Sequence, residues 1–132
     1  MAESRYARAI NKALCDALEA DRAVMVMGED IAEAGGSFKA TRGLLERFGP
    51  LRVRDTPISE AGIVGAAVGA ALTGMKPVVE IMFMDFVTLA MDALVNQAAK
   101  IRFMFGGQAS VPMVVRLPHG GRLNAAPQHS QC

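Results

Sequence analysis

The sequence has no tryptophan, one tyrosine and only two cysteines among its 132 residues. Cys15 and Cys132 stand far apart without C-x-x-C spacing, which indicates reduced thiols rather than a disulfide framework or a zinc site. Neither sign of charge is in clear excess, because the formal net charge is +1, and no basic run is interleaved with aromatic residues. The composition therefore gives no indication of nucleic-acid binding.

Long hydrophobic runs are also missing. The longest uncharged stretch, Ala61 to Met75, is shorter than the roughly 20 apolar residues that span a bilayer, so it predicts a buried helix and no membrane partner. The segment from Met1 to Arg5 lacks the hydrophobic core of a signal peptide, so we expect a cytoplasmic protein. The length suits one domain with a substantial core.

Apolar periodicity alternates between helix and strand along the chain. A first stripe at helical spacing predicts an amphipathic helix, and its members are Tyr6, Ile10, Leu14 and Leu18. The pattern then predicts helices over 41–48, 61–73 and 86–101, and strands over 23–27, 52–54, 78–81 and 111–117. This alternation predicts an α/β fold, in which helices cover both faces of a parallel sheet and a ligand binds beyond the carboxyl ends of the strands.

A polar turn, 55–60, delivers one carboxylate to the start of the uncharged helix. With Ser59 as N-cap, Glu60 falls in the first helical turn, where free N–H groups and the helix dipole favour an ionised side chain. Its apolar neighbours favour the neutral form, so the group could exchange a proton near neutral pH. The local pattern leaves a simpler explanation open, because acidic residues are common in first turns for the dipole reason alone.

One face of the same helix consists of small residues, namely Gly62, Gly65, Ala66, Gly69 and Ala70. A glycine inside a helix costs about 1 kcal/mol relative to alanine. Three such glycines therefore suggest that the backbone of another element approaches this face closely.

Several longer motifs follow one another in a consistent order. They are Gly28-Glu29-Asp30, residues 43–50, residues 55–62, residues 64–71, Pro77-Val78-Val79-Glu80, residues 82–86, residues 96–100 and Gln128-His129-Ser130-Gln131. In order and spacing, the sequence resembles the β subunit of thiamine-diphosphate-dependent 2-oxoacid dehydrogenases. That family includes the pyruvate, branched-chain and acetoin dehydrogenases.

The resemblance implies that this chain binds the aminopyrimidine end of thiamine diphosphate. It places Ile58, Glu60, Met82 and Phe86 around that ring. Glu60 would share a proton with the N1′ atom, which makes the 4′-amino group of the cofactor a base, whereas Phe86 would stack on the ring. Met82 and Ile58 would supply apolar contacts. Without the resemblance, apolar residues in this pattern would be read as ordinary core.

The resemblance also gives a role to His129 of the Gln-His-Ser-Gln motif. In the family this histidine lies in the active-site channel and is associated with acyl transfer to a lipoyl group. Considered alone, a histidine in a loop rich in glycine and proline is usually a solvated surface group. The resemblance assigns no role to His119, because residues 118–123 depart from the glycine-rich sequence that is usual in the family.

The resemblance also implies partner subunits, a metal ion and a second domain. Its α subunit holds the diphosphate and Mg²⁺, and this sequence has neither a Walker motif nor a G-x-G-x-x-G turn, so we expect no metal site of its own. The resemblance implies an α2β2 assembly with the α subunit and a second β subunit, which serves a lipoyl-bearing acyltransferase. The family's β subunit has a second domain after this segment, so we expect residues 1–132 to be a pyrimidine-binding domain cut before that domain, and inactive alone.

Two other classes of protein stay open. A transketolase-type thiamine enzyme shares the fold and the glutamate of the pyrimidine-binding domain. A non-catalytic oligomerisation or binding module could instead use the small-residue helix. The motifs favour the dehydrogenase, and they do not specify the 2-oxoacid.

Overall fold

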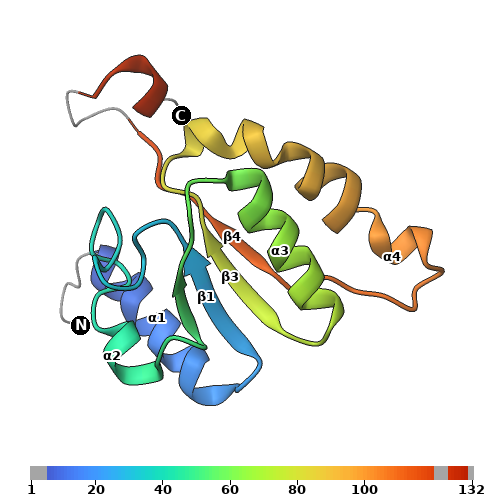
Figure 1. Ribbon diagram of the computed structural model, residues 1–132, viewed down its shortest axis with the longest axis horizontal. Coiled ribbons are helices and arrows are strands. Elements are labelled where there is room, and N and C mark those ends of the chain that lie inside the picture. The colour runs from blue at the N-terminus through green and yellow to red at the C-terminus, as the bar shows by residue number, and fades with distance from the viewer. Residues whose placement is uncertain (1–5, 121–124, 131–132) are drawn as a thin grey trace.

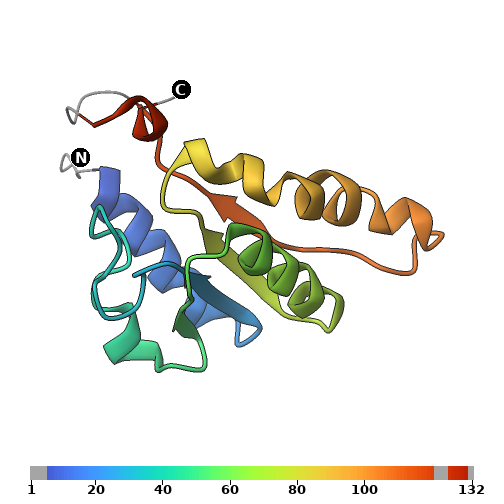
Figure 2. The same cartoon turned by 45° about the horizontal axis from the view of Figure 1, so that its top comes forward.

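The computed structural model describes residues 6–120 and 125–130. Its four strands form one parallel sheet in the order β2-β1-β3-β4, comprising β1 (Val24–Gly28), β2 (Val53–Asp55), β3 (Lys76–Glu80) and β4 (Val114–Arg116). Helices cover both faces of this sheet (Figure 1 and Figure 2). The predicted α/β architecture is therefore confirmed, although β4 is shorter than the strand expected over 111–117.

The three helices predicted before residue 80 are present. They are α1 (Tyr6–Ala20), α2 (Leu44–Phe48) and α3 (Glu60–Leu72). Tyr6 was expected in the buried stripe of the first helix, but 84% of it is exposed, because the first turn of α1 borders a cavity instead of packing on the sheet. In the described part of the chain, no helix is long and apolar enough to cross a bilayer.

The prediction of one regular helix over 86–101 is wrong. The segment forms a 3₁₀ helix, η1 (Met84–Ala90), a π-helix, η2 (Asp92–Ala98), and a short α-helix, α4 (Ile101–Met104). Tight and wide turns in succession change the rotation per residue, so the apolar residues do not stay on one face. Ala90 and Ile101 are buried, whereas Leu89 is 59% exposed.

Alternate residues of β1 pack in two separate hydrophobic cores, one on each face of the sheet. Val24 and Val26 pack with Leu14 and Leu18 of α1, and this core also contains Leu44 of α2. The intervening Met25 and Met27 pack on the opposite face, with residues of α3, β3 and η1. Because side chains alternate across a strand, a strand that is apolar throughout can be buried on both faces.

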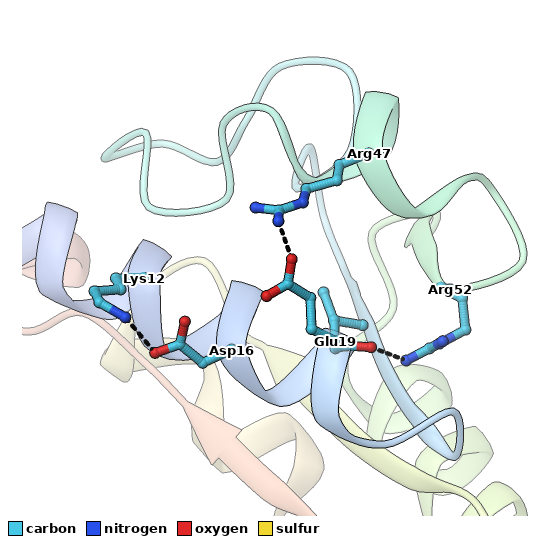
Figure 3. Close-up of polar contacts among 6 residues, drawn as sticks. Lys12, Asp16, Glu19, Arg47 and Arg52 are labelled. Carbon is cyan, nitrogen blue, oxygen red and sulfur yellow. Dashed lines mark hydrogen bonds and ion pairs between the residues drawn. The ribbon is translucent and has the colours of Figure 1, made fainter.

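Polar contacts fasten α1 to the neighbouring elements. Arg52 donates hydrogen bonds to the carbonyl oxygens of Leu18, at 3.0 Å, and Asp21, at 2.8 Å. Figure 3 shows Arg47 reaching from α2 to Glu19 on α1. This ion pair is half-exposed and contributes little stability, so the contacts of Arg52 are the more important anchor.

The strand order creates a crevice at one edge of the sheet. After β1 the chain passes to the face that carries α2, and after β3 it passes to the opposite face, where η1 packs on α3. Open α/β sheets bind ligands at such a point, where the connections from two neighbouring parallel strands leave in opposite directions. The strands approach closely here, since a Cβ atom on Gly28 would lie 2.5 Å from the carbonyl oxygen of Glu80.

Candidate active site

Glu60 is the first residue of α3 and lies beyond the carboxyl end of β2. Ser59 occupies the N-cap position as predicted, but its side chain makes no capping hydrogen bond. Glu60 is only 6% exposed, and its carboxylate has no hydrogen-bond partner among the described residues. A carboxylate of a buried residue at the positive end of a helix, without a hydrogen-bond partner in the described part of the chain, suits a hydrogen-bond donor from a ligand.

A second buried carboxyl, that of Glu29, lies directly after β1 and close enough to Glu60 to feel its charge. Burial raises the pKa of Glu29, and the charges of Glu60 and Asp30 raise it further, while a hydrogen bond from the backbone N–H of Ser59 lowers it. Its Oε1 atom is buried without a partner in the described part of the chain. Sequence analysis did not single out Glu29. Its position directly after a predicted buried strand could have indicated a site residue.

The raised pKa of Glu29 predicts a pH effect on stability. A carboxyl with a higher pKa in the folded chain binds more protons when folded, so the free energy of unfolding falls as pH rises above the ordinary pKa of 4.5. We expect Glu29→Gln to unfold at a higher temperature than the parent chain near neutral pH, and the difference to vanish below pH 4.5. Thermal unfolding over that pH range measures this effect.

The control for this measurement is Glu33→Gln, which neutralises an exposed carboxylate in the next loop. It should leave the pH dependence of the unfolding temperature close to that of the parent chain. Equal pH profiles for Glu29→Gln and the parent chain would contradict the assigned burial of Glu29.

Aromatic rings surround the other side of the crevice. The ring of His129, in η3 (Pro127–His129), lies 4.9 Å from the ring of Phe83 and 5.4 Å from that of Phe86, edge to face in both cases. Phe83 and Phe86 are themselves 6.3 Å apart. The structure therefore brings Phe86 and His129, two predicted site residues that are distant in sequence, into direct ring contact. Phe83, which sequence analysis did not single out, contacts both rings.

The remaining predicted site residues differ in burial. Met82 is half-buried between β3 and η1, at the expected edge of the sheet. Ile58 is 82% exposed in the turn before α3, so this chain does not hold it in an apolar pocket. A contact between Ile58 and a bound ring stays a prediction.

The end of β3 contributes an ion pair to the same edge. Glu80 is 4% exposed and accepts a hydrogen bond from Nη1 of Arg116, at the end of β4. Burial raises the pKa of Glu80, and the charge and hydrogen bond of Arg116 counteract that rise. Among residues 6–120 and 125–130, no cluster of three or more His, Cys, Asp or Glu side chains could hold a metal ion.

Fold and site together define an α/β domain with a parallel sheet, and beyond the carboxyl ends of its strands lie a buried carboxyl and a cluster of aromatic rings. In open α/β sheets this is the usual place for a ligand. The family model of the transketolase pyrimidine-binding domain matches residues 2–132. The chain belongs to this family.

Three curated proteins are similar to this chain over nearly its whole length. The chain is 48% identical over 130 residues to the mitochondrial pyruvate dehydrogenase E1 component subunit beta-2 of Oryza sativa, covering 98% of this chain and 35% of that protein. It is 46% identical over 131 residues to the 2-oxoisovalerate dehydrogenase subunit beta of Bacillus subtilis, covering 99% and 40%. A third relative is the acetoin:2,6-dichlorophenolindophenol oxidoreductase subunit beta of B. subtilis, 48% identical over 135 residues, covering 93% and 40%. The chain thus spans about two fifths or less of the length of these relatives.

Proposed function

We propose that this chain is the pyrimidine-binding domain of the β subunit of a thiamine-diphosphate-dependent 2-oxoacid dehydrogenase. The proposed reaction is the oxidative decarboxylation of a 2-oxoacid with acyl transfer to a lipoyl carrier. The family match and the names of three relatives, all β subunits of oxidoreductases, support this function. Those names favour a dehydrogenase over a transketolase-type enzyme.

The observation that carries the proposal is that Glu60 is buried while its carboxylate has no hydrogen-bond partner among residues 6–120 and 125–130. It suits the N1′ atom of an aminopyrimidine, because a carboxylate can accept a hydrogen bond from a protonated ring nitrogen and can also share the proton. When bound, the cofactor supplies a carbon nucleophile that attacks the 2-oxoacid. Phe86 and Met82 would contact the pyrimidine face, and Ile58 would close over its edge.

His129 would act on the substrate side of the crevice. Its ring is half-buried, and Phe83 and Phe86 hold its orientation by edge-to-face contacts. A ring held in this way can donate or accept a hydrogen bond at a fixed position, as acyl transfer to a lipoyl group requires. We assign His129 this positioning and proton-transfer role.

The proposed assembly divides the cofactor between chains. An α subunit would hold the diphosphate and Mg²⁺, and a second β subunit would complete an α2β2 enzyme that serves a lipoyl-bearing acyltransferase. Glu60 and Glu29 are buried carboxyls near the proposed cofactor site, and their negative charges would repel a diphosphate. A cytoplasmic location is part of the proposal, although the name of the rice relative places that protein in mitochondria.

A binding measurement tests this division. The pyrimidine end offers one charged hydrogen bond and aromatic contacts, together worth only a few kcal/mol before the entropic cost of association. We expect the 132-residue chain alone to bind thiamine diphosphate weakly or not at all in the presence of Mg²⁺, and to decarboxylate no 2-oxoacid.

Isothermal titration and a 2-oxoacid panel provide the readouts, first on the chain alone and then on the longer β subunit mixed with an α subunit. Turnover only in the mixture would support the proposal. Submicromolar binding of the cofactor to the chain alone would contradict it, since a complete site would then lie within this chain.

A further inference from the structure

A cavity of about 690 Å³ lies at the carboxyl edge of the sheet, next to the aromatic cluster. The first turn of α1, residues 38–40, Phe83 and the segment 116–120 form its wall. Figure 1 shows the start of α1 and the end of β4 at this same edge. The volume falls within the range of about 300 to 1,000 Å³ that is typical of small-molecule sites.

Aromatic and apolar side chains form most of this wall. The rings of Phe38 and Phe83 meet edge to face at 6.2 Å, and Ile10 and Leu117 add aliphatic surface. Tyr6 and Phe38 are 84% and 40% exposed, so an apolar face is open to solvent at the mouth. Burial of such rings against a flat ligand is favourable, and aromatic pairs contribute beyond the area that they bury.

The polar groups of the wall favour a negative charge. Arg116 lines the cavity, and of its five N–H donors one goes to Glu80, with no other hydrogen bond from its side chain to a described residue. His119 lies beside it, and no acidic residue lines the cavity in the described part of the chain.

We propose that this cavity binds a single-ring aromatic carboxylic acid, whose ring packs against Phe38 and Phe83 and whose carboxylate accepts hydrogen bonds from Arg116. The site is distinct from the proposed pyrimidine contacts at Glu60 and Phe86. It goes beyond the proposed function, since it requires neither the thiamine cofactor nor a partner subunit. Phe83 belongs to both sites, because its ring also contacts His129.

The probes are phenylacetate, its uncharged isostere phenylacetamide, and phenylpyruvate, which carries a 2-oxo group. Each is titrated into the 132-residue chain, with amide chemical shifts in nuclear magnetic resonance spectra as the readout. We expect saturable binding of phenylacetate with shifts at Phe83, Leu117 and Gly120. Loss of the charge-assisted hydrogen bond should weaken phenylacetamide by about tenfold or more.

Matched variants separate the ring contact from the charge contact. Phe38→Leu should weaken phenylacetate by roughly five- to tenfold, whereas Phe103→Leu, at an exposed phenylalanine of α4 outside the cavity, should bind like the parent chain. Arg116→Lys retains the charge that faces Glu80 but loses the planar fork, and should also weaken binding. Because Phe38 lies on an exposed loop, its variant tests the site even where a change at Arg116 disturbs folding.

Equal affinity for phenylacetate and phenylacetamide would overturn the assignment of an acid. Equal affinity of the Phe38→Leu and Phe103→Leu variants, or the absence of saturable binding, would overturn the site itself. Tighter binding of phenylpyruvate than of phenylacetate would support the proposal and indicate that the site prefers an aromatic 2-oxoacid. Equal binding of these two acids would also support the proposal and indicate that the site accepts aromatic carboxylates in general.

Discussion

Replacement of Glu60 by glutamine in the assembled enzyme is expected to lower kcat by about 10²- to 10⁴-fold, the range typical of lost general acid–base catalysis. Glutamine retains the shape of the side chain and can still accept a hydrogen bond, but it cannot share a proton with the ring nitrogen of the cofactor. Glu60 is buried, and its carboxylate has no hydrogen-bond partner among the described residues, so it is free to interact with a ring nitrogen. Affinity for thiamine diphosphate should change far less than kcat.

Two measurements on the longer β subunit assembled with its α subunit decide this prediction. Turnover of the preferred 2-oxoacid gives kcat, and isothermal titration gives the affinity for thiamine diphosphate with Mg²⁺ present. Glu33→Gln, at an exposed loop position, is the matched control and should retain normal turnover. Near-normal kcat for Glu60→Gln would remove Glu60 from the proposed mechanism.

Replacement of Gly65 or Gly69 by leucine is expected to prevent assembly while leaving the chain folded. Both glycines are exposed on α3, and a Cβ atom at either position would meet nothing within 4 Å. Leucine also has a higher helix propensity than glycine, by nearly 1 kcal/mol, so α3 should become no less stable. Gly65 and Gly69 therefore have no packing role within the described part of the chain, and the proposed interface with a second subunit would explain why both positions stay small.

Overpacking at a close interface costs about 1 to 3 kcal/mol or more for each substitution, and a symmetric contact would incur it twice. Light scattering of the β subunit with its α partner gives the mass of the assembly, and circular dichroism confirms folding. Ala13→Leu, at an exposed position of α1, is the control and should assemble normally. An unchanged mass for Gly65→Leu would show that this face is not an interface.

The position of each site residue relative to its own helix or strand could be predicted from the sequence. Apolar runs such as Val24 to Met27 indicate strands buried on both faces, and the helices between them require parallel strands. The N-cap position of Ser59 puts Glu60 in the first turn of α3, because helix starts depend on neighbouring residues. The family motifs supplied roles for Met82, Phe86 and His129, and these roles stay proposals.

Relations between distant elements could not be read in the same way. Periodicity did not reveal that the segment 86–101 winds as 3₁₀, π and α turns, since contacts with α3 decide which of its residues are buried. For the same reason Leu89 is exposed although it belongs to the apolar stripe. The exposure of Tyr6 and Ile58 likewise depends on which elements lie beside them.

The sequence by itself determined the alternation of helices and strands, the location of Glu60 at a helix start and membership of a recognisable family, because local periodicity, capping and motif order are written along the chain. Only the tertiary structure decided that Glu29 lies beside Glu60, that Phe83 and Phe86 contact His129, and that Arg116 pairs with Glu80. Each of these contacts crosses between strand ends. The strand order β2-β1-β3-β4 sets which ends are neighbours, and packing of the whole sheet, rather than any local pattern, fixes that order.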